Sequence, residues 1–332
     1  LWAYQLTEDL FQKNMIVPNG KNHGILMYVD LSGSMSRQMP GTLEQMMNMA
    51  LFCRKVNIPF DVYGFSNCRY SEKHPTPWSE NKDMNRSILD AREDGEMVIT
   101  DSNFALVHML SSTCKKSDFD NAMAYLMLMK LGYSNRSYYD AEPGDLYGYI
   151  QNDYFRLGGT PLNSALVLAP SIAKDFQKKY AVEKLTTVFL TDGGATDSIT
   201  YRDSSREHRA VGSVYGEPVA IKHQGSTTQL PNKSGYSRRD GVTTLTLVEF
   251  YKNITGSTLI NFHIVDGKRD NFYSEYVSTD WMEGKEPAHY VTNEFIDGTW
   301  KEVLKNKFTV VEPAFGYDAR FLLKGQKDLE IK

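Results

Sequence analysis

GILMYVDLSGSM, residues Gly24 to Met35, is the stretch from which the fold of this chain can be predicted. Its first half, Ile25 to Val29, is an apolar run rich in residues that favour strands, and we expect a buried strand there. The run ends in an acidic and hydroxyl-bearing turn that carries Asp30, Ser32 and Ser34 at every second position. An extended backbone would project these three side chains to the same side. The stretch therefore predicts a strand that leads into a site.

The oxygen atoms of this turn suit a divalent cation. One carboxylate and two hydroxyl groups are hard ligands, the set that Mg²⁺ prefers in proteins. Gly33 lies between the two serines, where we expect it to let the chain curl tightly. The same pattern is typical of an ordinary capped turn, because Asp and Ser commonly satisfy turns and helix N-termini. The metal interpretation therefore depends on other parts of the sequence.

Two later stretches supply such parts. Leu157 to Leu162, LGGTPL, places Thr160 after two glycines and just ahead of an apolar helical segment. Taken alone it is a helix start, with Thr160 as the N-cap and Pro161 at the first helical position. Leu185 to Leu190 is a second apolar strand, and it ends in a Thr-Asp-Gly turn that contains Asp192.

These three motifs, in this order, resemble the von Willebrand factor A (vWA) domain and its metal-ion-dependent adhesion site. The resemblance implies that the two serines and the threonine contact a metal, whereas the two aspartates hold it mostly through water. It implies Mg²⁺, with Mn²⁺ or Ca²⁺ as alternatives, and an open coordination position for a carboxylate of a protein partner. The predicted metal site comprises Asp30, Ser32, Ser34, Thr160 and Asp192.

A narrower resemblance is to vWA proteins that work beside MoxR-type AAA+ ATPases, including the CobT-like large subunit of cobalt chelatase and the related magnesium chelatase subunit. It is carried by VDLSGSM, QMMNMALFCRKVNIPFDVYGFS, GGTPLNSAL and FLTDGGATDS. It implies a non-catalytic adaptor or subunit of a AAA+ ATPase complex in a bacterium or bacteriophage. A cobaltochelatase subunit acting in cobalamin synthesis is a less favoured form of this interpretation.

The remaining elements favour a doubly wound α/β fold with a mainly parallel sheet, because strands alternate with helices along the chain. Ligands of such sheets bind outside the carboxyl ends of the strands, where the winding reverses. Asp30 and Asp192 both follow strands and belong at that edge. Hydrophobic periodicity predicts helices over 41–56, 104–110, 119–131, 162–180, 243–254 and 295–304, and strands over 58–65, 97–100, 258–265, 308–311 and 320–323.

We expect one large domain with insertions. Residues 1–23 are a lead-in segment, residues 24–312 the vWA domain, and residues 313–332 a C-terminal extension. The polar composition of residues 66–154 and 193–240 marks them as insertions. The second insertion springs from the carboxyl edge of the site strand, so we expect it to form part of the ligand-facing surface. The short strand at 97–100 is expected to pair with the strand at 58–65.

Composition narrows the class of protein. The chain has 332 residues and a net charge of −4, so it carries no basic footprint for nucleic acid. No apolar run approaches the roughly 18 residues that span a bilayer. The 3 cysteines are scattered, which favours reduced thiols and a cytoplasmic location. His263 lies within an apolar strand, where a core histidine is the expected reading rather than a ligand.

Two other classes of function stay open. An enzyme that uses Asp30 as a phosphoryl-transfer nucleophile would also place an aspartate after its first strand, but that family expects a second Asp where Ser32 stands. The other hypothesis is a structural role, in which the chain is an assembly or virion component whose Tyr-rich loops pack on other copies of the same chain. Walker A, G-x-S-x-G and zincin motifs are absent, so the sequence offers no support for ATP hydrolysis, ester cleavage or metalloprotease activity.

Overall fold

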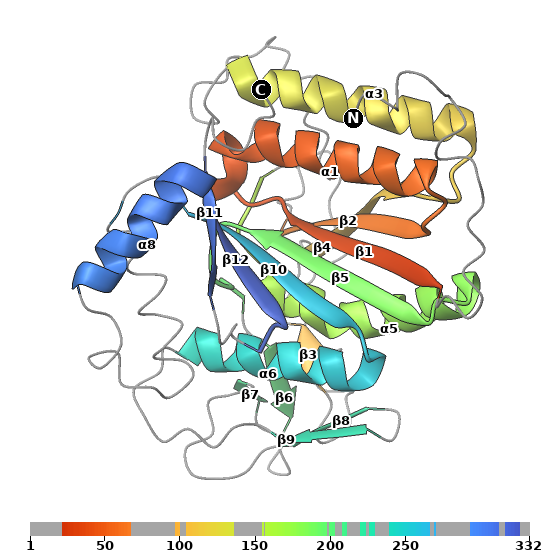
Figure 1. Cartoon of the computed structure of the whole chain (residues 1–332). Coiled ribbons are helices and arrows are strands. Elements are labelled where there is room, and N and C mark those ends of the chain that lie inside the picture. Colours follow the sequence, from red (N-terminus) through yellow and green to blue (C-terminus); the bar gives the residue numbers. More distant parts are fainter. Residues whose placement is uncertain are drawn as a thin grey trace, which may run out of the picture.

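A central sheet flanked by helices forms the body of the protein (Figure 1). The computed structural model describes residues 22–67, 97–99, 104–135, 155, 157–197, 199–202, 208–210, 220–223, 226–229, 239–265, 269, 293–311 and 316–325. Within these residues, 7 strands form one sheet in the order β11-β12-β10-β5-β1-β2-β4. Their bounds are β1 His23–Asp30, β2 Phe60–Asn67, β4 Phe104–Ser111, β5 Lys184–Thr191, β10 Thr258–Val265, β11 Phe308–Val311 and β12 Ala319–Lys324.

Strand direction confirms the predicted fold class. β1, β2, β5, β10 and β12 run parallel to their neighbours, whereas the two edge strands, β4 and β11, are antiparallel. Helices α1 (Met39–Lys55) and α3 (Lys116–Asn135) cover one face, and α5 (Leu162–Tyr180) and α6 (Arg239–Thr255) cover the other (Figure 1). Helix α8 (Asn293–Asn306) packs beside β11 and β12. The architecture is therefore a doubly wound α/β fold.

The central strand β1 shows why its apolar run is continuous. Met27 and Val29 pack into the cluster beneath α1 and α3, whereas Leu26 and Tyr28 pack into the cluster beneath α5 and α6. A parallel strand covered by helices on both faces needs apolar side chains at odd and even positions alike. Tyr28 and Phe189 stack with ring centroids 4.7 Å apart, which joins β1 to β5.

β1 also marks the point where the winding reverses. From β1 the chain passes through α1 to its neighbour β2, while β5 and then β10 are added on the other side of β1. The carboxyl ends of β1 and β5 therefore diverge into loops at the same edge of the sheet. In sheets of this kind, that edge is where ligands bind.

Helix α5 has the bounds that its periodicity predicted, although its start differs in detail. Pro161 is the N-cap and makes no side-chain cap hydrogen bond, so Thr160 lies one residue ahead of the cap. Pro170 lies inside the helix and does not divide it into two. The helix ends at Tyr180, and its C-cap residue Ala181 has a left-handed φ of 50°.

Two sequence predictions on the α1 side of the sheet are corrected. Residues 104–110 were expected to be helical but form β4, an edge strand whose residues pair with β2. Ala, Leu and Met favour helix, and the cross-strand pairing outweighs that local preference. The helix expected over 119–131 is longer at both ends, since α3 spans Lys116–Asn135.

The insertions form two small sheets in the described part of the chain. Strands β3 (Met97–Ile99), β6 (Ile199–Arg202) and β7 (His208–Ala210) make one sheet, and β8 (Ala220–His223) and β9 (Ser226–Gln229) make the other. β3 therefore pairs with β6, not with β2 as the sequence suggested. Ile199 is fully buried in the core cluster of α5 and α6, so this sheet packs on that side of the domain.

Some of the predicted segments lie wholly or partly outside the described residues. Residues 1–21 of the lead-in segment, residues 68–96 and residues 136–154 lie outside them. β12 occupies an interior position of the main sheet, so the sheet extends into the segment expected to be a C-terminal extension. None of the helices in the described part of the chain is both long and apolar enough to span a membrane.

The orientation of α5 can be tested with two identical substitutions. Leu166 is 0% exposed and packs in the core, whereas Leu168 is 39% exposed on the same helix. Leu166→Ala should lower the free energy of unfolding by about 2–5 kcal/mol, because it leaves a core cavity. Leu168→Ala should change it by less than about 1 kcal/mol. Urea denaturation followed by circular dichroism measures both, and equal losses would contradict this orientation.

Candidate functional site

Asp30 is the innermost residue of the candidate site and is fully buried at the end of β1. Its Oδ1 accepts a hydrogen bond from the Ser32 backbone N–H at 2.9 Å. Its Oδ2 accepts one from the Thr191 hydroxyl at 2.7 Å. Burial raises the pKa of Asp30 to about 7, against the lowering effect of these hydrogen bonds. The carboxylate thus links the loop after β1 to the end of β5, with both oxygens already engaged.

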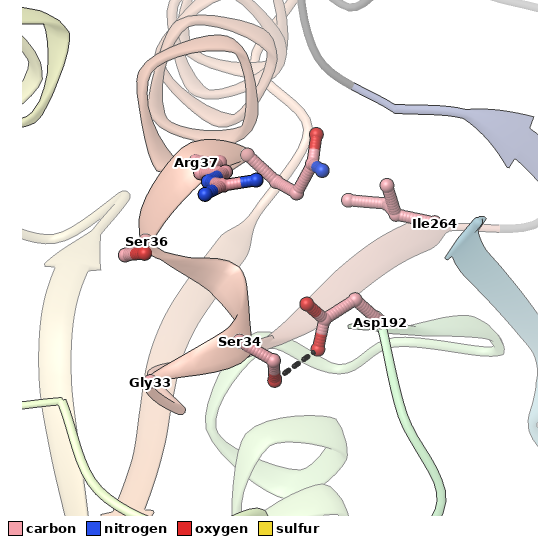
Figure 2. Close-up of a pocket in the computed structure, with 7 residues that line it drawn as sticks. Gly33, Ser34, Ser36, Arg37, Asp192 and Ile264 are labelled. Atoms are coloured by element: carbon pink, nitrogen blue, oxygen red, sulfur yellow. Dashed lines mark hydrogen bonds between the residues drawn. The ribbon is translucent and has the colours of Figure 1, made fainter. Parts of the chain in front are cut away.

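Three oxygen atoms in front of Asp30 form a hydrogen-bonded chain. The Ser34 hydroxyl donates to Asp192 Oδ1 at 2.8 Å (Figure 2). The Ser32 and Ser34 hydroxyl oxygens are 3.0 Å apart. Because the single hydrogen of Ser34 is directed to Asp192, the Ser32 hydroxyl donates to Ser34. The structure therefore brings two predicted hydroxyl ligands and one predicted carboxylate into direct contact, although Ser32 and Asp192 lie on separate strand ends.

The loop after β1 has a backbone conformation that the sequence did not predict. Ser32 forms a parallel bridge with Gly158, and residues Ser34–Arg37 form a 3₁₀ helix rather than continuing an extended chain. Gly33 has φ −62° and ψ −33°, which any residue can adopt. The chain does curl tightly here, but glycine is not required for it, since Gly33 has an ordinary right-handed helical conformation.

Thr160 is brought to the same edge of the sheet but is held differently. It is buried, and its backbone N–H and C=O exchange hydrogen bonds with Thr196, each 2.9 Å long. A Cβ built on Gly193 would lie 4.0 Å from the Thr160 hydroxyl oxygen, which places this hydroxyl beside the turn of Asp192. In the described part of the chain, no hydrogen bond joins that hydroxyl to the other four predicted ligands.

The two glycines before Thr160 let three loops meet backbone to backbone. The Gly33 N–H donates to the Gly158 carbonyl at 2.8 Å, and the Gly158 N–H donates to the Leu31 carbonyl at 3.2 Å. The Gly159 N–H donates to Asn67 Oδ1 at 2.7 Å. A Cβ on Gly158 would collide with the backbone carbonyl oxygen of Asn67. Gly158 is therefore required by close approach, and Asn67 is a bracing residue that sequence reasoning missed.

Asp197 is a second residue that the sequence analysis missed. Its carboxylate accepts hydrogen bonds from the backbone N–H groups of Asn163 and Ser164, at 3.1 and 2.7 Å, and from the Ser164 hydroxyl. It thereby satisfies the first turn of α5, which Pro161 leaves without a side-chain cap. Burial raises its pKa. The ATDS tetrapeptide after Gly194 carried a weak signal, because Asp is a common partner of helix N-termini.

A hollow of about 340 Å³ opens in front of this network (Figure 2). Ser34 and Asp192 form part of its wall, and Ile264 from the end of β10 forms another part. No lining residue comes from the described part of the insertion 193–240, which was expected to face the ligand. Among the described residues, the hollow is lined by Gly33, Ser34, Ser36, Arg37, Gln38, Asp192 and Ile264.

The donor set decides which cation could be held. Among the described residues, no three His, Cys, Asp or Glu side chains gather in a way that could hold a metal. The predicted ligands at this edge offer hydroxyl and carboxylate oxygens. His263 is buried on β10 opposite Thr191, and its electrostatic interaction with Asp192 lowers the pKa of that carboxyl against the larger raising effect of burial. The oxygen set fits a hard cation such as Mg²⁺ better than zinc.

Comparison with known proteins gives structural likenesses only. No protein-family model matches the chain, and no curated protein matches it. One similar solved structure is the pilus adhesin SpaC from Lactobacillus rhamnosus GG in an open conformation, with a TM-score of 0.39 and 14% identity. The match covers 87% of this chain and 31% of SpaC, so this chain spans less than a third of that protein.

A second similar structure is the vWF domain of the type V pili tip protein Mfa5 from Porphyromonas gingivalis. Its TM-score is 0.33 and its identity is 10%, over 86% of this chain and 96% of that domain. Neither likeness bears on what this chain binds. The description of the fold rests on the strand order, strand directions and helix layers of the chain itself.

Gly158 and Gly33 offer a matched pair of substitutions. Gly158→Ala should lower the free energy of unfolding by about 1–3 kcal/mol or more, because its Cβ would collide with the Asn67 backbone. Gly33→Ala should change it by less than about 1 kcal/mol, because its nearest Cβ contact is 3.7 Å from the Gly158 carbonyl oxygen. Chemical denaturation compares the two variants. Similar stability of both would show that the close approach at Gly158 is not a constraint.

Proposed function

We propose that this chain is a vWA-type module that binds a protein partner through Mg²⁺, without being a catalyst itself. The observation that carries the proposal is the continuous set of oxygens formed by Ser32, Ser34 and Asp192 at the switch point of the sheet, with Asp30 directly behind. Thr160 lies at the same edge. A bound Mg²⁺ would supply a positive centre with room for one carboxylate from a partner. Mn²⁺ and Ca²⁺ are the alternative ions.

The charge balance of the site supports a cation there. Asp30 is fully buried and accepts hydrogen bonds from a backbone amide and a hydroxyl, neither of which carries a charge. Asp192 is partly buried, and burial raises its pKa. Two carboxylates so close together, each desolvated, favour a bound cation because a cation stabilises their charged forms.

The same geometry disfavours the phosphoryl-transfer alternative. A nucleophilic aspartate must present one oxygen to the substrate. Asp30 is 0% exposed, and both of its oxygens accept hydrogen bonds. The hollow is lined instead by Asp192, which is hydrogen-bonded to Ser34. This geometry supports an ion-binding role over a nucleophilic role for Asp30, because the position from which an Asp30 nucleophile would react is closed.

The partner class proposed is a AAA+ ATPase of the MoxR or chelatase type, in a bacterium or bacteriophage. The motifs VDLSGSM, GGTPLNSAL and FLTDGGATDS support it through their resemblance to the vWA subunits of such complexes. The proposal includes a cytoplasmic location, because the 3 scattered cysteines favour reduced thiols. A structural or virion role through self-association is the competing candidate, and a cobaltochelatase subunit is the less favoured third.

Metal binding is tested by titration calorimetry with Mg²⁺ on the whole chain. Ser34→Ala should weaken Mg²⁺ binding by about tenfold or more, because a contact to a charged group contributes about 1.5–3 kcal/mol. Ser36→Ala is the matched control, since Ser36 lies in the same 3₁₀ helix and lines the same hollow but is not a predicted ligand. Its affinity should stay within about twofold. Equal effects of the two variants, or no binding by the wild type, would rule out the metal site.

The partner is tested by affinity capture from the native source with Mg²⁺, with EDTA, and with the Asp30→Ala and Ser34→Ala variants. The exposed Ser34 provides a variant that leaves the buried core intact. A AAA+ ATPase retained by the wild type only when Mg²⁺ is present is the expected result. Retention of the same proteins in all arms, or of this chain alone, would favour the self-assembly alternative.

A further inference from the structure

Arg37 lines the same hollow as Ser34 and Asp192 (Figure 2). It is exposed, and within the described residues it has no ion-pair partner. Neither the fold nor the predicted metal ligands require a cation at this position. A long cationic side chain that lines a hollow and is not engaged elsewhere is available to a ligand.

The local backbone places Arg37 in register with the metal site. Residues Ser34–Arg37 form one turn of 3₁₀ helix. Side chains at positions i and i+3 of such a helix eclipse each other, and each residue rises about 2 Å, so Arg37 and Ser34 share one side about 6 Å apart along the axis. Ser34, a predicted metal ligand, and the Arg37 guanidinium are therefore placed to contact the same bound molecule from neighbouring positions.

The rest of the wall limits what that ligand can be. Ile264 is 1% exposed and contributes an apolar surface, while Gln38 is 6% exposed and contributes an amide. A guanidinium presents a planar fork that matches the two oxygens of a carboxylate. With a cation beside Ser34, the hollow would hold two positive centres. It would then repel basic side chains and favour a ligand with two negative groups.

We propose that Arg37 determines specificity by recognising a second carboxylate of the partner, next to the one that reaches the metal. The inference rests on the proposed function, because it takes the metal as the first anchor. In an extended segment, side chains two residues apart lie on the same side and about 7 Å apart. This spacing is close to the rise of about 6 Å along the axis that a 3₁₀ turn places between Ser34 and Arg37. The recognised element is therefore an extended acidic peptide segment of the form acidic-x-acidic.

The test uses N-acetylated, C-amidated heptapeptides with the sequences GSDGDSG, GSDGSSG and GSDGKSG, titrated in Mg²⁺. The wild type should bind the first about fivefold or more tightly than the second, since an exposed charged pair contributes about 1 kcal/mol, and should bind the third weakest. Arg37→Ala should lose the preference for GSDGDSG. Lys301→Ala, which removes an exposed cation from α8, should keep it.

A parallel Mg²⁺ titration without peptide separates the two proposals. Arg37→Ala should bind Mg²⁺ as tightly as the wild type or more tightly, because it removes a positive charge near the ion. If the wild type binds Mg²⁺ but does not distinguish the peptides, or Arg37→Ala keeps the preference, the role of Arg37 is overturned and the metal module stands. If the wild type binds no Mg²⁺, both proposals fail.

Discussion

The buried carboxylate of Asp30 is the constraint on which the rest of the site depends. It ends the central strand at the point where the winding of the sheet reverses, and it accepts hydrogen bonds from the Ser32 amide and the Thr191 hydroxyl. These bonds orient the loop after β1 against the end of β5. Because both oxygens are engaged on protein donors, Asp30 shapes the site from behind, while Ser34 and Asp192 face the hollow. The two aspartates therefore have different roles: Asp30 is buried behind the site, and Asp192 lines the hollow.

A second set of contacts makes the edge a single unit. Gly158 bridges to the loop after β1, Gly159 binds the side chain of Asn67 at the end of β2, and Thr160 exchanges backbone hydrogen bonds with Thr196. Asp197 then holds the first turn of α5. The backbone groups of these loops are satisfied by one another and by the side chains of Asn67, Thr196 and Asp197, while Ser34 and Asp192 line the hollow. Under the proposed function, a site preorganised in this way would lose little conformational freedom on binding an ion.

Strongly periodic elements were predicted well, and elements defined by their partners were not. Helix α5 and strand β10 have the predicted bounds, because their side-chain periods are unambiguous over many residues. β4 was predicted as a helix because FALVHML has no clear alternation, and its identity comes from pairing with β2. β3 was predicted as a strand with the wrong partner, since its true neighbour β6 lies about a hundred residues later. Local pattern carries no information about such pairing.

The sequence by itself determined the doubly wound α/β fold, the strand ends at which Asp30 and Asp192 lie, and the candidate oxygen set with its three motifs. Short-range patterns suffice for these features. A parallel strand buried on both faces is a continuous apolar run, and a turn is marked by a few consecutive residues, so both can be recognised locally. Only the tertiary structure decided that Asn67 braces Gly159 across 92 residues and that Asp197 binds α5 across 33. It also decided that Arg37 lines the same hollow as Asp192. These placements depend on how distant segments pack together, and no local period encodes that.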